Sequence, residues 1–150
     1  MPIDSRMIDN MKADRVRKVA DLANRRTRER FGRFLIEGPQ SVREAVTWMP
    51  DAVRDLYVQA VDGPDGPRIA GETLTSIVER SQEHRIYVHP ASEAVMRRIS
   101  PDCQGIAAVG DADAVRATAQ GTQLPEKPFV AAFWQVRDPG NAGTVIRAAD

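Results

Sequence analysis

Helix-like and strand-like segments alternate along most of this chain. Val16, Val19, Ala20 and Ala23 have the spacing of residues on one face of a helix, which predicts a helix over about 12–30. The same alternation continues to about residue 110, and it predicts an α/β domain in which helices pack on a sheet. The further expected elements are strands at 33–37, 56–61, 85–88 and 106–109, helices beginning at Pro39 and around 74–78 and 95–99, a loop at 62–67 and a short helix at 111–119.

Positive charge is concentrated near the N-terminus, although the chain of 150 residues has a formal net charge of zero. Residues 11–34 hold nine Lys and Arg side chains and only three acidic ones. Such a cluster indicates a polyanionic partner such as a nucleic acid. The candidate phosphate contacts are Arg25, Arg26, Arg28 and Arg30. The alternative is a solvated helix face that carries arginine only for solubility.

The cysteine and histidine content limits the chemistry of any site. Cys103 is the single cysteine, so no internal disulfide is possible and a reducing compartment, the cytoplasm, is expected. His84 and His89 have no companions at metal-ligand spacing, so no metal site is expected. No apolar stretch has the length that crosses a bilayer, and we expect no membrane partner. Residues 1–11 are short and polar, and we expect them to be flexible.

The end of the chain has the order of a strand, a tight turn and a helix. The apolar run 129–136 leads into a turn in which Gly140 and Gly143 allow positive φ and the close approach of a ligand. Asn141 is suited to cap the helix, and Arg147 is near enough to fold back toward the same turn. This arrangement predicts a site for phosphate or ribose groups at the start of a helix. The alternative is an ordinary turn between a strand and a helix, followed by a solvated arginine.

Residues 137–150 read Arg-Asp-Pro-Gly-Asn-Ala-Gly-Thr-Val-Ile-Arg-Ala-Ala-Asp. This stretch resembles the first signature motif of the SpoU (TrmH-type) RNA ribose 2′-O-methyltransferases, in which a strand leads into D-P-x-N-x-G and an Arg-x-Ala sequence follows. Segments 33–38 and 104–109 also resemble parts of that family's N-terminal substrate-binding domain. The resemblance covers nearly the whole chain, strongly at its end and weakly in the middle.

The resemblance implies an α/β chain with two domains. After the flexible residues 1–11, residues 12–110 are expected to form an RNA substrate-binding domain similar to a ribosomal-protein-like α/β sandwich. Residues 111–127 are expected to be a linker. Residues 128–150 are expected to hold the first strand and the start of the first helix of a SPOUT methyltransferase domain, whose fold contains a trefoil knot. The chain is then the front part of a longer enzyme.

The resemblance also implies roles for the final turn. Arg147 is expected to act in catalysis by helping to activate the ribose 2′-hydroxyl, and Asn141 is expected to shape that site. Gly140 and Gly143 are expected to contact the RNA, together with the four candidate arginines. The implied cofactor is S-adenosylmethionine, whose binding motifs are expected after Asp150. A homodimer formed through the rest of the SPOUT domain is implied as well.

The leading hypothesis is therefore 2′-O-methylation of ribose in rRNA or tRNA by a parent enzyme, with this chain inactive alone. One alternative is a stand-alone RNA-binding module without catalysis. Another is the nucleotide-phosphate site of an unrelated Rossmann-like enzyme, which needs a further strand that ends in an acidic ribose ligand. The pattern does not distinguish between the two kinds of RNA.

Overall fold

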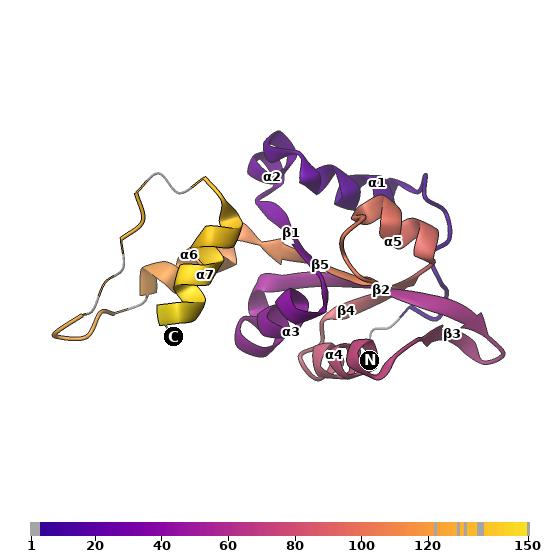
Figure 1. The fold of residues 1–150 in the computed structure, drawn as a ribbon. Helices are drawn as coiled ribbons and strands as arrows, with labels where there is room; N and C mark the ends of the chain where they lie inside the picture. Colours follow the sequence, from indigo (N-terminus) through magenta and orange to yellow (C-terminus); the bar gives the residue numbers. More distant parts are fainter. Residues whose placement is uncertain (1–3, 122, 129, 131, 135–136, 150) are drawn as a thin grey trace. The chain divides into compact units, whose positions relative to one another are not determined.

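The computed structural model describes residues 4–121, 123–128, 130, 132–134 and 137–149. The chain divides into two compact units, Met1–Gln120 and Gly121–Asp150. In the first unit, helices cover both faces of one sheet (Figure 1). The expected α/β class is therefore confirmed.

The sheet of the first unit is mixed, and β2 (Val53–Gly63) pairs with three other strands. On one side, β5 (Ile106–Asp111) runs antiparallel to β2, and β1 (Arg33–Glu37) runs antiparallel to β5. On the other side, β4 (Tyr87–Ala91) is parallel to β2. The end of β2 forms a hairpin with β3 (Gly66–Ile69). Because β2 and β4 are parallel, the segment between them has to cross over one face of the sheet, and it does so with a helix.

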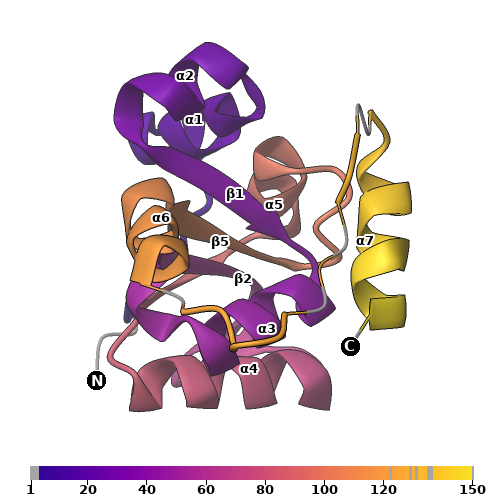
Figure 2. The same cartoon turned by 90° about the vertical axis from the view of Figure 1, so that its left-hand side faces the viewer.

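Different helices cover the two faces of this sheet. The helical elements of the described residues up to 121 are α1 (Asp14–Ala20), η1 (Asp21–Ala23), α2 (Arg25–Phe31), α3 (Pro39–Trp48), η2 (Pro50–Ala52), α4 (Glu72–Glu83), α5 (Glu93–Ile99) and α6 (Ala112–Gly121). Residues of α1, η1 and α5 pack on one face, and residues of α3 and α4 pack on the other. Figures 1 and 2 show these two layers on opposite sides of the strands.

Side chains that alternate along β2 separate the apolar core into two clusters. Tyr57 packs with Val16 of α1 and Met96 of α5, whereas its neighbours Leu56 and Val58 belong to the cluster formed with α3 and α4. Each of these five side chains is at most 2% exposed. Successive side chains of a strand point to opposite faces, so a strand with apolar residues in succession is covered on both sides.

The single helix expected over 12–30 is wrong, because three short helical elements occupy this region. Asn24 has an extended backbone, with φ −83° and ψ 126°, between η1 and α2. Its side-chain oxygen accepts a hydrogen bond from the backbone N–H of Arg26 at 3.0 Å, and Asn24 therefore caps α2. Asparagine competes for backbone hydrogen bonds in this way, so a helix can be interrupted although its apolar spacing continues.

The loop expected at 62–67 is also wrong. β2 continues to Gly63, and β3 follows after a turn of only two residues, 64–65. Proline and glycine indicated a loop by composition, but here they occupy the turn of a hairpin and the ends of its strands. The strand expected at 85–88 begins two residues later, as β4, because Arg85 has a left-handed φ of 59°.

The described part of the N-terminal segment, which was expected to be flexible over residues 1–11, is hydrogen-bonded to β4 at Asp4 and Ile8. Asp4 donates its backbone N–H to the carbonyl of Val88 at 3.0 Å, and Ile8 donates to the carbonyl of Pro90 at 2.8 Å. These bonds satisfy carbonyl groups of β4 that its pairing with β2 leaves free. The polar composition of the segment gave no sign of them, because the bonds use backbone atoms.

Among the described residues of the second unit, α7 (Pro139–Ala149) is the one helix that lies wholly within this unit. Half of the strand expected at 129–136 lies outside the described residues, and the described half forms no strand. A strand is stable only beside another strand, and the described part of this unit contains none.

Gly32 ends α2 with a left-handed backbone, φ 60° and ψ 32°, and so turns the chain into β1. Replacing Gly32 by alanine is expected to lower the free energy of unfolding by about 1–2 kcal/mol, because a Cβ is strained in this conformation. Urea unfolding followed by circular dichroism measures the loss. Gly121→Ala is the control, since Gly121 has no left-handed φ and nothing lies within 4 Å of an added Cβ. Equal losses in the two variants would contradict this explanation.

Candidate nucleic-acid interface

A groove of about 600 Å³ lies between α1, η1 and α2 on one side and strands β1, β2 and β5 on the other. Its apolar lining includes Leu22, Tyr57 and Val109, each at most 6% exposed, and the far more exposed ring of Phe31. Its polar and charged lining residues are Arg15, Lys18, Asp21, Thr27, Arg33 and Asp55. Sites for unpaired nucleotides combine cations with aromatic surfaces in this way.

A second hollow, of about 380 Å³, shares Lys18 and Asp21 with the groove. Its other lining residues are Arg17, Ala20 and Arg98. Neither Lys18 nor Arg98 has an ion-pair partner among the described residues, so both charges are available to a ligand. We call the groove and this hollow together the basic face.

Two of the four arginines predicted to bind RNA have partners within the protein. Arg25 is paired with Glu29, with 2.7 Å between Nε and Oε1. Arg28 donates to the backbone carbonyls of Leu22 and Ala23 at 2.9 and 2.7 Å, and it therefore holds η1 and α2 together. Arg28 thus has a structural role that the clustering of charge did not indicate.

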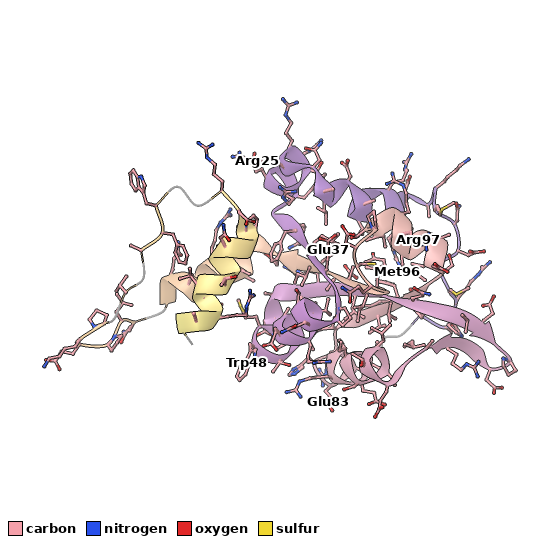
Figure 3. All side chains as sticks on the ribbon, viewed as in Figure 1. Arg25, Glu37, Trp48, Glu83, Met96 and Arg97 are labelled. Carbon is pink, nitrogen blue, oxygen red and sulfur yellow. The ribbon has the colours of Figure 1, made fainter. Side chains whose placement is uncertain are left out.

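The other two predicted arginines are more available. The guanidinium of Arg30 lies 5.2 Å from the centroid of the Phe31 ring, which places a cation beside the exposed aromatic surface of the groove. The side chain of Arg26 is exposed and has no partner among the described residues. Figure 3 shows the position of Arg25 near α2 and of Arg97 on α5, where Arg97 is paired with Glu93.

Asp111 joins β1, β2 and α6 behind the groove. Its Oδ2 accepts hydrogen bonds from Arg33 and from Nε of Arg54, the latter at 2.9 Å. Its Oδ1 accepts the backbone N–H groups of Asp113 and Ala114 at 3.0 and 3.2 Å. The bonds from Arg54, Ala114 and Arg33 hold the pKa of Asp111 well below its usual value. Arg33, which lines the groove, is thus oriented by a carboxylate far away in the sequence.

A buried histidine connects the N-terminal segment to the groove. The side chain of His89 is 3% exposed, its Nδ1 lies 2.6 Å from Oδ2 of Asp4, and its Nε2 lies 3.0 Å from Oδ1 of Asp55. Its ring also contacts those of Tyr57 and Tyr87, with centroids 4.9 and 4.7 Å away. Burial alone would raise the pKa of Asp4, but hydrogen bonds from His89 and Tyr87 hold it below its usual value. Spacing in the sequence gave no signal for this cluster.

Asp138, and not Asn141, caps α7. The side chain of Asp138 accepts the backbone N–H of Gly140 at 2.9 Å, and its carbonyl accepts that of Ala142 at 3.3 Å. Pro139 is the first residue of the helix, where its fixed φ and missing N–H are favourable. The predicted capping role of Asn141 is therefore wrong, because the proline begins the helix before it.

Gly140 and Gly143 lie inside α7 without a left-handed φ, so they do not use the positive φ that glycine allows. Arg147 folds back toward the start of the helix. Its Nη2 donates to Oγ1 of Thr144 at 3.2 Å, and its Nη1 lies 3.3 Å from the position that a Cβ on Gly143 would take. Gly143 therefore leaves room for the guanidinium of Arg147, while Asn141 and Arg147 stay exposed.

Three further features of the described residues concern membrane spans, metal ligands and the thiol. No helix there is both long and apolar enough to cross a membrane. In the same part of the chain, no three His, Cys, Asp or Glu side chains are grouped to hold a metal ion. Cys103 is buried, its thiol donates to the carbonyl of Met96 at 3.7 Å, and burial raises the pKa of that thiol.

Comparison with known proteins first identifies the class of the N-terminal domain. A family model described as the MRM3-like substrate binding domain matches residues 13–108, and the chain belongs to this family. Comparison with curated proteins finds no match. The match ends before residue 111, and it includes every residue that lines the groove except Val109.

Solved structures then relate the fold to the SpoU methyltransferases. An RNA 2′-O ribose methyltransferase has a TM-score of 0.57 at 22% identity, over 95% of this chain and 51% of that one. The SpoU methyltransferase AviRb from Streptomyces viridochromogenes, in complex with AdoMet, has a TM-score of 0.56 at 22% identity, over 93% of this chain and 49% of that one. An rRNA methyltransferase from Sinorhizobium meliloti has a TM-score of 0.54 at 13% identity, over 74% of this chain and 38% of that one.

These likenesses are of fold, and the chain spans about half or less of each of the three structures. Together with the family match, they confirm the resemblance to the N-terminal portion of the SpoU (TrmH-type) family.

Proposed function

We propose that this chain is the RNA-binding front part of an S-adenosylmethionine-dependent ribose 2′-O-methyltransferase that acts on rRNA or tRNA. The observation that carries the proposal is the basic face, which lies within a domain of a substrate-binding family. The three structures described above are methyltransferases by their names, and two of the names specify rRNA or 2′-O ribose chemistry.

The basic face is suited to bind RNA in two complementary ways. Lys18 and Arg98 are exposed cations without partners in the described chain, and they are suited to neutralise phosphates. Phe31 is 57% exposed at the groove, and a ring in this position is suited to stack with an unpaired base. Phosphate contacts position the RNA, and contacts in the groove supply preference for particular nucleotides.

For α7, we propose that Arg147 acts in catalysis and that Asn141 shapes the same site. A ribose 2′-hydroxyl is a weak nucleophile at neutral pH, and a cation beside it stabilises the alkoxide that develops as it reacts. The guanidinium keeps its charge and presents a planar set of donors. Gly143 supports the proposal, because a Cβ at this position would lie 3.3 Å from Nη1 of Arg147 and crowd the guanidinium. Gly140 and Gly143 are proposed to lie against the RNA.

The residues of α7 do not by themselves fit S-adenosylmethionine. Most ligand sites enclose well over half of the ligand surface, whereas Asn141 and Arg147 of α7 are exposed. We therefore propose that the cofactor site and a homodimer interface belong to the rest of a SPOUT domain, that residues 128–150 are its beginning, and that residues 1–150 alone transfer no methyl group. A cytoplasmic location is proposed as well, since the single cysteine is a buried thiol.

A stand-alone RNA-binding module is the second candidate function. It is favoured by the fact that both hollows of the basic face are formed entirely by residues of the unit Met1–Gln120. The two candidates differ in one assay. A protein that joins this chain to a complete SPOUT domain transfers a methyl group from S-adenosylmethionine to RNA only under the first proposal.

Binding of RNA itself is tested with the 150-residue chain and fluorescently labelled single-stranded RNA. The dissociation constant, measured by fluorescence anisotropy, is expected to rise steeply between about 50 and about 300 mM KCl. With about three phosphate contacts, the slope of log K against log salt is expected to be about −2. A flat salt dependence, or no binding at low salt, would contradict the proposed function.

A further inference from the structure

Two groups that line the groove have hydrogen-bonding capacity that the described protein does not use. Asp55 is 41% exposed, and it offers Oδ1 to His89 while its Oδ2 has no partner among the described residues. Tyr57 is 2% exposed, and its hydroxyl makes no hydrogen bond within the same part of the chain. Both residues lie on one face of β2, two positions apart. A carboxylate with an unused acceptor oxygen and a tyrosine thus line the same groove.

The carboxylate of Asp55 limits which part of an RNA molecule can bind beside it. Ionised Asp55 only accepts hydrogen bonds, and a phosphate beside it would add a second negative charge. Lys18, a cation of the groove without an ion-pair partner among the described residues, is suited to the phosphates instead. Asp55 is therefore suited to the edge of a base that presents N–H donors.

The four bases differ in how well they match two carboxylate oxygens. Guanine presents two neighbouring donors, N1–H and the amino group at N2. Adenine and cytosine each present one amino group beside a ring nitrogen that accepts, and uracil presents one N–H between two carbonyl oxygens. An acceptor next to the donor is repelled by the carboxylate, whereas a second donor forms a second bond. Only guanine matches both oxygens.

We propose that the groove binds one unpaired guanine of the RNA, whose N1–H and N2–H groups donate to Asp55. This rests on the proposed RNA binding and adds a specificity-determining residue to it. Phe31 supplies an aromatic surface for the same base, with the guanidinium of Arg30 beside its ring. The guanine is a recognition base and is distinct from the ribose proposed to react near Arg147.

Asp4 and His89 act as positioning residues for Asp55. His89 is buried, so its ring is held by packing, and its two nitrogens join the carboxylates of Asp4 and Asp55. Asp4 is held in turn by its backbone bond to Val88 and by the hydroxyl of Tyr87 at 2.8 Å. A carboxylate held in one orientation discriminates between base edges better than a mobile one.

Anisotropy titrations of the 150-residue chain with four RNA oligomers test the guanine site. Each oligomer is an oligouridine of about nine nucleotides. Three of them carry a single central G, A or C, and the fourth is unsubstituted. The oligomer with G is expected to bind about tenfold more tightly than the other three. Asp55→Asn is expected to bring the four affinities within about twofold of each other, while the affinity for oligouridine stays the same or rises slightly. Asn keeps an oxygen that faces His89, so the fold is expected to be retained. Asp4→Asn is expected to weaken the preference for G without removing it.

Asp65→Asn is the matched control, because it makes the same change of charge in the exposed turn between β2 and β3. It is expected to keep the full preference for G. Binding of all four oligomers with equal affinity, or a preference for G that survives in Asp55→Asn, would overturn the guanine site and leave the proposed function standing. Failure of every oligomer to bind would refute the proposed function and the guanine site with it.

Discussion

Arg147→Ala, in a protein that joins this chain to a complete SPOUT domain, is expected to lower the rate of methyl transfer about 100- to 1,000-fold. Loss of one positioned donor to a developing oxyanion has effects of this size. The dissociation constant for RNA is expected to change less than about threefold, because one exposed cation contributes little to the total charge contact. Single-turnover transfer of a labelled methyl group measures the rate, and anisotropy measures the affinity.

Two further variants make this result specific to Arg147. Arg147→Lys keeps the charge but loses the planar donors, and it is expected to recover only part of the rate. Arg116→Ala removes an exposed arginine of α6 that is paired with Asp113, and it is expected to leave the rate unchanged. A loss of RNA affinity in Arg147→Ala with unchanged turnover would assign this arginine to binding and refute its role in catalysis.

The double variant Lys18→Ala, Arg98→Ala is expected to weaken RNA binding by the 150-residue chain about tenfold or more at low salt. Both side chains line the second hollow of the basic face, and neither has an ion-pair partner among the described residues. Loss of two phosphate contacts is also expected to make the salt slope shallower by about 1.4. Anisotropy titrations at several salt concentrations measure both quantities.

The matched control for this variant is Arg43→Ala, Arg80→Ala. These two arginines line a hollow of about 100 Å³ between α3 and α4, on the other face of the sheet. The change in net charge is the same, so a general effect of charge predicts equal losses in the two double variants. A loss confined to Lys18 and Arg98 places the RNA on the basic face, whereas equal losses would contradict that placement.

Sequence reasoning found the layers of the fold because they depend on local patterns. Val42 and Val46 have helical spacing, and both are fully buried in α3. Ile106 and Ala108 alternate with residues of the opposite face in β5, as expected for a strand that is covered on both sides. Such patterns repeat within one element, so a window of a few residues contains the whole signal.

Where local patterns failed, a competing interaction had prevailed. Asn24 began a new helix, α2, by accepting a hydrogen bond with its own side chain. Pro139 began α7 before Asn141 and gave the capping position to Asp138. The proline and glycine residues at 62–67 indicated a loop by composition, but the pairing of β2 with β3 forms a hairpin there. In each case the residue type correctly indicated a turn or a cap. The hydrogen-bonding partner then determined where the helix or strand begins.

By itself the sequence determined the α/β class, the basic N-terminal region and the resemblance of residues 137–150 to a SpoU motif. Only the tertiary structure determined which charges are available and which are used internally. Arg28 is bound to carbonyl groups, whereas Lys18 and Arg98 are left for a ligand. The structure alone also brought Asp4, Asp55 and His89 together. These three residues are distant in the chain, and no periodic pattern links them, because their contacts follow from the pairing of β4 with β2 and with the N-terminal segment.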